Sequence, residues 1–167
     1  IARAADISKA GLLHHYSSKD QLLAAVLDER DRRTMSRLPD GDEGAEAALD
    51  AWVEMVAHNQ RHPDGVALYT AMSAAVIDAS HQAHPWFRQH LMATIEYLVG
   101  ALERGKAAGE VLPDAPSEQI ARKLVALSDG LQVQWLCSRA DGGHAVDMRA
   151  VTAGVVSDIK DRWLVPS

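Results

Sequence analysis

Residues 1–27 read IARAADISKAGLLHHYSSKDQLLAAVL, and this stretch decides the fold of the chain. Apolar residues recur in it at helical spacing and are interrupted by short polar segments. Ser8 is placed to cap one helix, because its hydroxyl can accept a hydrogen bond from an unpaired backbone N–H group. Ser17 or Ser18 is placed to cap the next helix in the same way. The pattern predicts two short helices joined by a tight turn and followed by a third helix, which is the layout of a helix-turn-helix unit.

The same stretch resembles the DNA-binding segment of the TetR (tetracycline-repressor-like) family of transcriptional regulators. The second helix of that unit opens with Ile-Ala, as at residues 1–2, and the recognition helix begins at a Ser and ends in an aromatic residue, here Ser8 and Tyr16. Two positions depart from the family pattern. Leu13 stands where a Tyr is usual, and the expected Gly is displaced by one residue to Gly11. These departures concern which bases are read. The resemblance also implies that the first helix of the unit lies before residue 1, so that the unit is incomplete here.

The resemblance places the helix over 8–16 in the major groove of DNA, with Leu12 and Tyr16 facing inward. Lysine can donate to guanine or phosphate, small apolar groups can contact a thymine methyl, and the start of the next helix favours phosphate. The alternative for the two histidines is a solvated surface position. The residues expected to contact DNA are Ser8, Lys9, Ala10, Gly11, Leu13, His14, His15 and Lys19.

Charge is distributed unevenly along the 167 residues. Residues 1–37 hold seven basic and five acidic side chains, a net charge of +2, whereas the remaining 130 hold 10 basic and 18 acidic ones, a net charge of −8. A mildly basic head on an acidic body is typical of a protein that touches phosphates with one end only. No run of 18 apolar residues indicates a membrane span, and the single Cys137 excludes an internal disulfide. We therefore expect a cytoplasmic protein.

The rest of the chain predicts helices alone, so the expected fold class is all-α. The turn cluster at 39–42 marks a boundary between a helix-turn-helix DNA-binding domain with its connecting helix, residues 1–38, and a helical ligand-binding and dimerisation domain, residues 39–167. The expected helices after the recognition helix cover about 18–38, 43–61, 66–80, 85–109, 117–140 and 145–165.

The last two predicted helices are those that pair across a two-fold axis in the family that the chain resembles. The helix over 117–140 is apolar on more than one face, and such a helix is buried on more than one side. Simple burial inside one protomer is the alternative, and Cys137 is either a small core residue or an interface residue. The expected dimer interface comprises Gly130, Val133, Leu136, Cys137, Val151, Val155, Ile159 and Trp163.

The resemblance also implies a ligand cavity among the central helices. Met and aromatic side chains adapt to ligands, although they also make ordinary core, and their abundance here favours an apolar or aromatic ligand. Tyr69, Thr94 and Gln132 are candidate polar contacts. His58 and His62 are spaced like metal ligands, but no further ligand completes a site, so we expect neither a metal nor a cofactor. The candidate ligand-binding residues are Trp52, Met55, Leu68, Tyr69, Met72, Phe87, Leu91, Ile95 and Trp135.

Together these features predict a homodimeric, ligand-responsive DNA-binding transcriptional regulator. The expected action is that of a repressor, released from a palindromic double-stranded operator by a small apolar or aromatic effector. Two alternatives remain: a helical small-molecule-binding or interaction module without DNA binding, and a small helical enzyme. For the enzyme, no nucleophile elbow, phosphate loop or metal-spaced cluster is present in the sequence.

The double substitution Lys9→Ala with Lys19→Ala tests the assignment of the head. Loss of two phosphate contacts should weaken DNA binding and reduce the slope of log K against log salt concentration by about 1.8. A titration of DNA binding at several salt concentrations measures both quantities. An unchanged salt slope would contradict the assignment.

Overall fold

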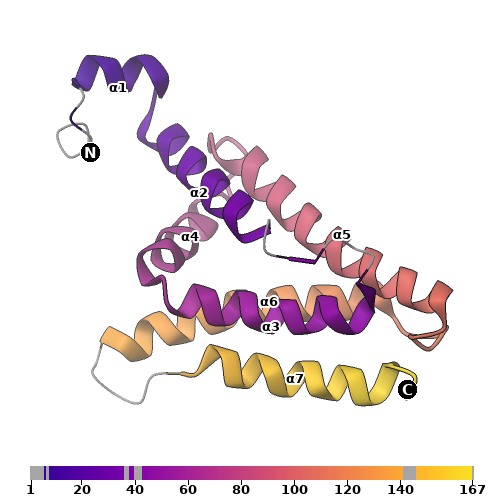
Figure 1. The fold of residues 1–167 in the computed structure, drawn as a ribbon. Helices are drawn as coiled ribbons and strands as arrows, with labels where there is room; N and C mark the ends of the chain where they lie inside the picture. The colour runs from indigo at the N-terminus through magenta and orange to yellow at the C-terminus, as the bar shows by residue number, and fades with distance from the viewer. Residues whose placement is uncertain (1–5, 7, 36–37, 40–42, 141–145, 167) are drawn as a thin grey trace.

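A computed structural model describes residues 6, 8–35, 38–39, 43–140 and 146–166 of the chain. Within this part, all regular elements are α-helices, so the predicted fold class is confirmed (Figure 1). The helix expected over residues 1–7 lies outside the described residues. The helices are α1 (Lys9–His15), α2 (Lys19–Met35), α3 (Gly44–Gln60), α4 (Pro63–Ala75), α5 (His84–Ala108), α6 (Ser117–Ala140) and α7 (Met148–Trp163).

The start of α4 differs from the prediction. The segment 62–65 was expected to break the helical pattern, but α4 begins at Pro63. Proline suits the first turn of a helix, where its missing N–H group has no partner to lose. The helix also ends at Ala75 rather than at Ser80, because a carboxylate oxygen of Asp78 accepts from both the backbone N–H and the hydroxyl of Ser80 and stabilises a turn there.

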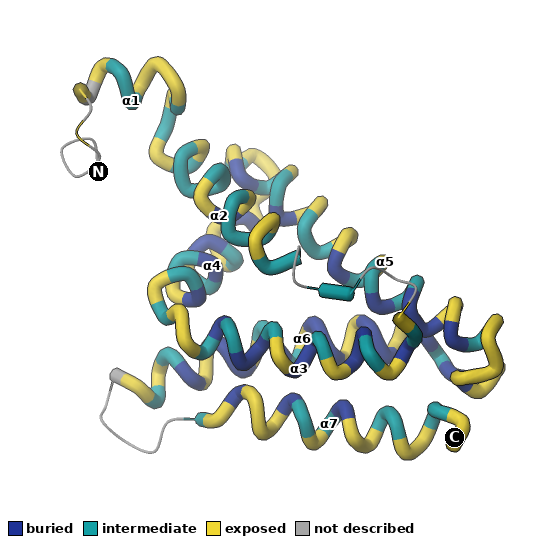
Figure 2. The backbone as a smooth tube through the Cα atoms, viewed as in Figure 1, coloured by how far each residue is buried: buried dark blue, intermediate teal, exposed yellow. Residues whose placement is uncertain are grey.

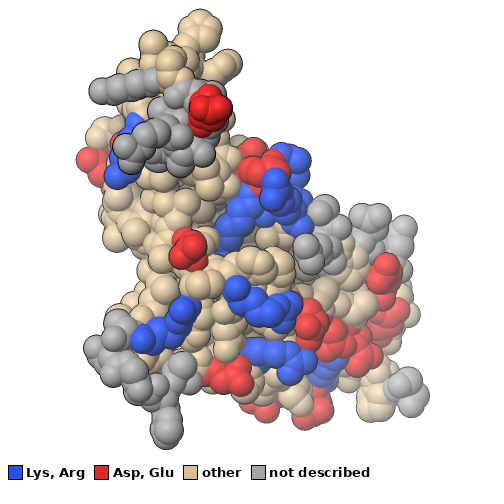
Figure 3. Space-filling model, turned by 60° about the vertical axis from the view of Figure 1, so that its left-hand side comes forward, with Lys and Arg blue, Asp and Glu red and all other residues tan. Residues whose placement is uncertain are grey.

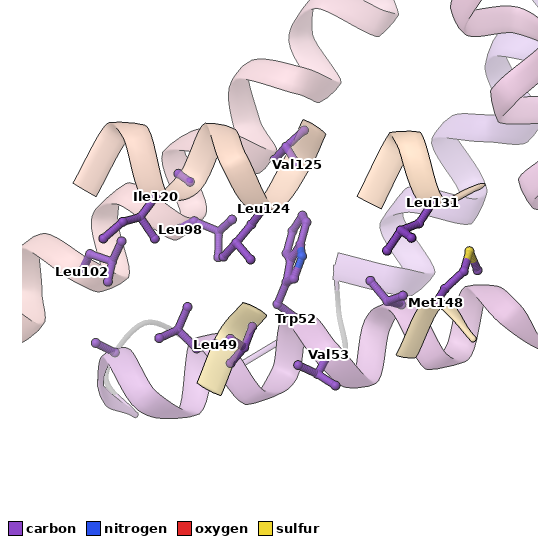
Figure 4. Close-up of a cluster of buried hydrophobic side chains, with 14 of the residues drawn as sticks. Leu49, Trp52, Val53, Leu98, Leu102, Ile120, Leu124, Val125, Leu131 and Met148 are labelled. Carbon is purple, nitrogen blue, oxygen red and sulfur yellow. The ribbon is translucent and has the colours of Figure 1, made fainter. Parts of the chain in front are cut away.

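The main core lies between α3, α5, α6 and α7. Figure 4 shows Leu49 and Trp52 of α3 pointing toward Leu98 of α5 and Leu124 of α6. These side chains are at most 2% exposed. The one polar atom of the Trp52 ring is satisfied, because its Nε1–H donates to Ser128 Oγ at 3.2 Å. This packing joins α3, α5, α6 and α7 around one core, called the body below.

A second core cluster attaches α2 to that body. Leu27 of α2 is fully buried against Tyr69 and Met72 of α4 and Phe87 of α5. Figure 2 shows buried residues recurring along α3, α4 and α6, whereas the described part of α1 has none. Burying a leucine side chain contributes about 2 kcal/mol. The connecting helix is therefore part of the body as well as part of the head, whereas α1 projects away from the body (Figure 1).

The beginning of α2 is tied to the loop that precedes α5. Ser18 caps α2, since its hydroxyl accepts from the backbone N–H of Gln21 at 3.1 Å, and the same hydroxyl donates to Gln82. Asp20 and His81 lie 3.7 Å apart between their nearest charged atoms. These contacts fix the position of the turn between α1 and α2 relative to the body.

Two glycines shape the end of α5. Gly109 ends the helix with a left-handed φ of 77°, and the N–H of Glu110 donates to the carbonyl of Gly105 at 2.8 Å, as in a Schellman motif. The helix end predicted near residue 109 is thereby confirmed. At Gly105 a Cβ atom would lie 2.6 Å from Cγ2 of Val111 and 2.8 Å from Cβ of Ala45. The close approach of these elements requires a glycine at this position.

The C-terminal residues pair with the loop that follows α5. The N–H of Leu112 donates to the carbonyl of Trp163, and the N–H of Val165 donates to that of Glu110, each at 2.9 Å. This short antiparallel pairing closes the body at the end remote from α1 (Figure 1).

The substitution Gly105→Ala should destabilise the fold by about 1–3 kcal/mol, because its Cβ atom overpacks the contact with Val111 and Ala45. Gly100→Ala in the same helix is the control. Its Cβ atom would meet only the flexible end of Arg104, and the gain in helix propensity is up to about 1 kcal/mol. Urea unfolding measures both variants, and equal midpoints would show that the close approach is unimportant.

Candidate DNA-binding face and effector cavity

The recognition helix is capped at both ends. Ser8 Oγ accepts from the N–H of Gly11 at 2.9 Å, and the N–H of Tyr16 donates to the carbonyl of Leu12 at 2.9 Å. The predicted N-cap at Ser8 is therefore confirmed. A helix of seven residues is too short to be stable alone, so these caps and its neighbours must hold it.

The face of α1 assigned to DNA is open to solvent. Leu13 is 50% exposed, and His14 and His15 are exposed with their ring centroids 5.5 Å apart. Ser8, Ala10 and Lys19 are also exposed, Gly11 is partly buried, and the side chain of Lys9 lies outside the description. Leu12 and Tyr16, the expected inward residues, are partly buried.

Arg30 links α2 to the body. Its Nη2 donates to Asn59 Oδ1 of α3 at 2.9 Å, and its guanidinium carbon lies 5.9 Å from the ring centroid of Tyr69 in α4. Burial lowers the pKa of Arg30, but neighbouring Asp31 opposes this shift. The charge of Arg30 is thus held at the junction of α2, α3 and α4.

A second link runs from α2 to α5. The Nε1–H of Trp86 donates to Asp28 at 3.3 Å, and His90 pairs through Nδ1 with Asp31. The rings of Trp86 and His90 stack with an interplanar angle of 6° and centroids 5.2 Å apart. Two carboxylates of the connecting helix are therefore held by two stacked rings of the body.

A large cavity of about 930 Å³ opens between α4, α5 and α6. This volume falls in the range of small-molecule sites. Its wall is mostly apolar, and the strongly exposed Ile77 and the half-exposed Met92 also line it. The apolar wall residues include Val76, Phe87, Leu91, Ile95, Val99 and Val125.

A smaller cavity of about 50 Å³ lies on the inner side of the same wall, against α2 and α3. Its lining is more polar and includes Trp52, Ser128 and Gln132. Tyr69 and Asp129 line both cavities. The two cavities are thus an outer and an inner compartment with a common wall.

Burial is the main cause of the pKa shifts of Asp129 and Tyr69, the two residues of that wall. Desolvation raises the pKa of the Asp129 carboxyl, although His90 and a hydrogen bond from Tyr69 oppose this shift. Desolvation also raises the pKa of the Tyr69 hydroxyl, so the phenol stays protonated and donates to Asp129. Asp129 is therefore a carboxyl group held in a poorly hydrated position.

The candidate ligand-binding residues fall into separate places. Tyr69, Phe87, Leu91 and Ile95 line the outer compartment, and Trp52, Met55 and Tyr69, together with the polar candidates Thr94 and Gln132, line the inner one. Leu68 lines a groove beside α2. Met72 and Trp135 are packed in the two core clusters, with the Arg139 guanidinium 4.7 Å from the Trp135 ring centroid.

Sequence reasoning missed Asp129. The signal was available: a single carboxylate stands between the apolar positions Val125 and Leu131 in a helix that is buried along that side. A charge on a buried stripe needs partners, and here Tyr69 supplies one.

The expected dimer face lies on the outside of α6 and α7. Val133 is 48% and Val151 42% exposed, and Gly130 and Cys137 are exposed too, so burial of these residues within one protomer is wrong. The alternative of Cys137 as a core residue fails for the same reason. The remaining expected interface residues are partly buried against the core, namely Leu136, Val155, Ile159 and Trp163.

The described residues contain no group of three His, Cys, Asp or Glu side chains that could hold a metal ion. His58 and His62 stack with ring centroids 4.1 Å apart, and His62 Nδ1 lies 2.8 Å from the carbonyl oxygen of His58. In the same part of the chain, no helix is both long and apolar enough to cross a bilayer. On the surface seen in Figure 3, basic and acidic side chains are interspersed over the body.

Comparison with known proteins agrees with this geometry. Residues 1–26 match the model of the bacterial regulatory proteins of the tetR family. The A-factor receptor protein of Streptomyces griseus is 27% identical in an alignment of 161 residues that covers 92% of this chain and 51% of the receptor. The chain therefore spans about half the length of that relative.

Solved structures show the same fold. A TetR-family transcriptional regulator from Rhodococcus sp., described as putative, superposes with a TM-score of 0.77 at 19% identity, over 95% of this chain and 84% of that one. A TetR transcription regulator from Haloarcula marismortui gives a TM-score of 0.76 at 22% identity, over 98% and 85% of the two chains. The chain is thus similar to TetR-family regulators in its first 26 residues and in its fold. The proteins named here are described as transcriptional regulators and as a receptor.

The raised pKa of Asp129 gives a prediction about stability. A carboxyl whose pKa is higher in the folded than in the unfolded chain costs stability once pH rises through these two values, and costs nothing below both. Asp129→Asn should therefore raise the free energy of unfolding at pH 7 relative to the original chain, and this gain should fade as pH falls toward 4.

Urea unfolding at several pH values measures the difference. Asp158→Asn is the control, because Asp158 is exposed on α7. A gain at pH 7 that persists unchanged at pH 4 would contradict the assigned cause.

Proposed function

We propose that this chain is the regulatory portion of a homodimeric DNA-binding transcriptional regulator whose affinity for its operator is controlled by a small molecule in the outer compartment. The observation that carries the proposal is the double role of α2. The helix follows the recognition helix directly, and it is packed against the body through Leu27, Arg30 and Asp31. A change at the cavity wall therefore reaches the DNA-binding face through one continuous helix.

The coupling route consists of direct contacts. Tyr69 and Phe87 line the outer compartment, and both pack with Leu27 of α2. Asp129 on the same wall interacts electrostatically with His90, which pairs with Asp31 of α2. A ligand that favours one position of this wall shifts the population of α2 positions, and a ligand can shift it only by its differential affinity for the two states.

The proposed dimer uses the outer faces of α6 and α7. Val133 and Val151 are large apolar side chains exposed there in the single chain. A two-fold dimer would present two recognition helices, which matches the paired half-sites of a palindromic operator. By this proposal the protein acts as a repressor in the cytoplasm, and the effector releases it from DNA.

The test uses the full-length protein and DNA from upstream of its own gene. Fluorescence anisotropy should show binding to this DNA above a scrambled fragment of equal length. A thermal-shift screen of apolar and aromatic compounds should yield molecules that stabilise the protein and weaken DNA binding, because the linkage between the two ligands is reciprocal. Absence of DNA preference would instead favour a helical small-molecule-binding module.

The substitution His90→Phe tests the route. It keeps an aromatic ring on Trp86 but removes the pair with Asp31. We expect DNA binding within about threefold of the original and at least a tenfold weaker response to the effector, in line with a coupling free energy of about 1–3 kcal/mol. Arg149→Ala, which breaks an exposed ion pair between α7 and Glu54 of α3 and involves no residue of α2, is the control. If the effector weakens DNA binding of His90→Phe as strongly as that of the original protein, the His90–Asp31 pair is not part of the coupling route.

A further inference from the structure

Four ionisable side chains from three helices line the inner compartment together: Arg30 and Asp31 of α2, His90 of α5 and Asp129 of α6. His90 pairs through Nδ1 with Asp31, and both side chains are only 20% exposed. Asp129 is partly buried and interacts electrostatically with His90. These four residues are called the charge network below. They connect the helix that follows α1 with two helices of the body.

The charge network carries a net negative charge when His90 is neutral and both carboxyl groups are ionised. Arg30 then supplies one positive charge, whereas Asp31 and Asp129 supply one negative charge each. Desolvation already raises the pKa of Asp129, which means that its ionised form is costly at this position. One proton, on either His90 or Asp129, would bring the net charge to zero. Because a net charge is costly to bury, the folded network favours the uptake of that proton.

His90 is well placed to hold the proton. A charged imidazole there would lie between the carboxylate of Asp31 and that of Asp129, which belong to different helices. Its ring is held in position by stacking on Trp86. Imidazole is also the side chain that changes its charge between about pH 5 and 8. Loss of the proton would turn the charged pair with Asp31 into a weaker hydrogen bond from a neutral ring.

The other charged groups near His90 do not supply the missing positive charge. Asp28 and Arg32 of α2 line the groove that contains His90, and both are exposed. Arg32 is paired with Glu29. Tyr69 faces the network from α4 and stays protonated, because burial raises its pKa. The described residues that α3 contributes to the inner compartment are uncharged, namely Trp52, Met55 and Asn59.

The outer compartment presents two positive and two negative side chains on the far side of Asp129. All four are exposed, and Arg122 is paired with Glu118 at 2.8 Å. His84 also lines this compartment, and its Nδ1 lies 2.7 Å from the carbonyl oxygen of Val76. Exposed charges are screened by water and salt, so the proton balance depends mainly on the network itself. The four exposed charged residues are Arg88, Glu96, Glu118 and Arg122.

We propose that the charge network is a proton-dependent switch: as pH falls below about 7 it takes up one proton, shared by His90 and Asp129, and this proton holds α2 against the body. Asp31 lies one helical turn after Leu27, so the switch acts beside the apolar contact of α2. The inference goes beyond the proposed function, because it concerns how firmly α2 is attached whether or not a small molecule is bound.

The proposed switch fixes the sign of the pH dependence. The folded network binds more protons than the same side chains bind in the unfolded chain. The free energy of unfolding therefore falls as pH rises through this range. One proton changes the unfolding constant by at most about tenfold per pH unit.

Urea unfolding of the full-length protein, without DNA and at a fixed protein concentration, tests the shared proton between about pH 6 and 8. Asp129→Asn removes a negative charge and keeps the side-chain size. His90→Gln removes the imidazole and leaves an amide that can donate to Asp31. We expect the unfolding constant of the original protein to rise by about threefold more per pH unit than that of either variant. The matched controls His15→Gln and Asp158→Asn, at exposed positions on α1 and α7, should behave like the original.

The two variants separate the shared proton from simpler arrangements. A reduced pH dependence in His90→Gln alone would describe an ordinary His90–Asp31 ion pair. A reduction in Asp129→Asn alone would describe a carboxyl group that takes the proton by itself. Either result overturns the proposal, and so does a pH dependence that is the same in the original protein and in both variants.

Hydrogen exchange of backbone amides tests the attachment of α2. Protection factors around Leu27, corrected for the intrinsic pH dependence of exchange, should be about tenfold larger at about pH 6 than at about pH 8. This difference should disappear in His90→Gln. Amides of α7 are the internal reference, and an equal change in α2 and α7 would overturn the proposal. Neither experiment uses DNA or an effector, so failure of the switch and failure of the proposed function are distinguishable.

Discussion

The burial of Leu27 between α4 and α5 is the contact on which the arrangement of head and body depends. It converts a helix that belongs by sequence to the DNA-binding unit into a structural part of the body. Without it, the apolar contacts of α2 would be reduced to those of the partly buried Leu23 and Ala24. The remaining links are mostly hydrogen bonds and ion pairs, several of them with exposed partners, and such contacts contribute little to stability. The apolar contact holds α2 against the body. The polar contacts of Arg30 and Asp31 fix the rotation of α2 about its own axis.

The same arrangement explains why a polar cavity stands beside an apolar one. α2 and α3 bring Arg30, Asp31 and Asn59 to the inner side of the wall, whereas α5 and α6 present a mostly apolar surface to the outer side. Tyr69 suits the boundary, because its ring packs with Phe87 and its hydroxyl is bonded to Asp129. Desolvation of that carboxylate is a cost of folding that a donor from a ligand would lower.

Much of this was predictable from periodicity and caps. Ser8 and Gly109 mark their helix ends through local hydrogen bonds, so sequence alone located them. The start of α4 at Pro63 was missed because a proline both breaks and begins helices, and only the tertiary setting separates these roles. The cavity candidates were harder still. Phe87 and Trp135 look alike in the apolar pattern, yet one lines the outer compartment and the other is packed in the core. Whether an apolar side chain lines a cavity or packs in the core depends on how the neighbouring helices are placed.

The pairing between the C-terminal residues and the loop after α5 gives that helix a mechanical role. α5 is clamped near its C-terminal end at Gly105 and carries Ile95 on the cavity wall. Its N-terminal end lies beside α2 at Trp86. At a rise of about 1.5 Å per residue, Ile95 lies roughly 15 Å from the clamp and Trp86 roughly 28 Å from it. A rigid rod pivoting at the clamp that is pushed aside by about 1 Å at Ile95 is displaced by about 2 Å at Trp86. In the proposed regulator α5 would act as a lever whose longer arm ends beside α2, the helix that follows the candidate DNA-binding helix α1.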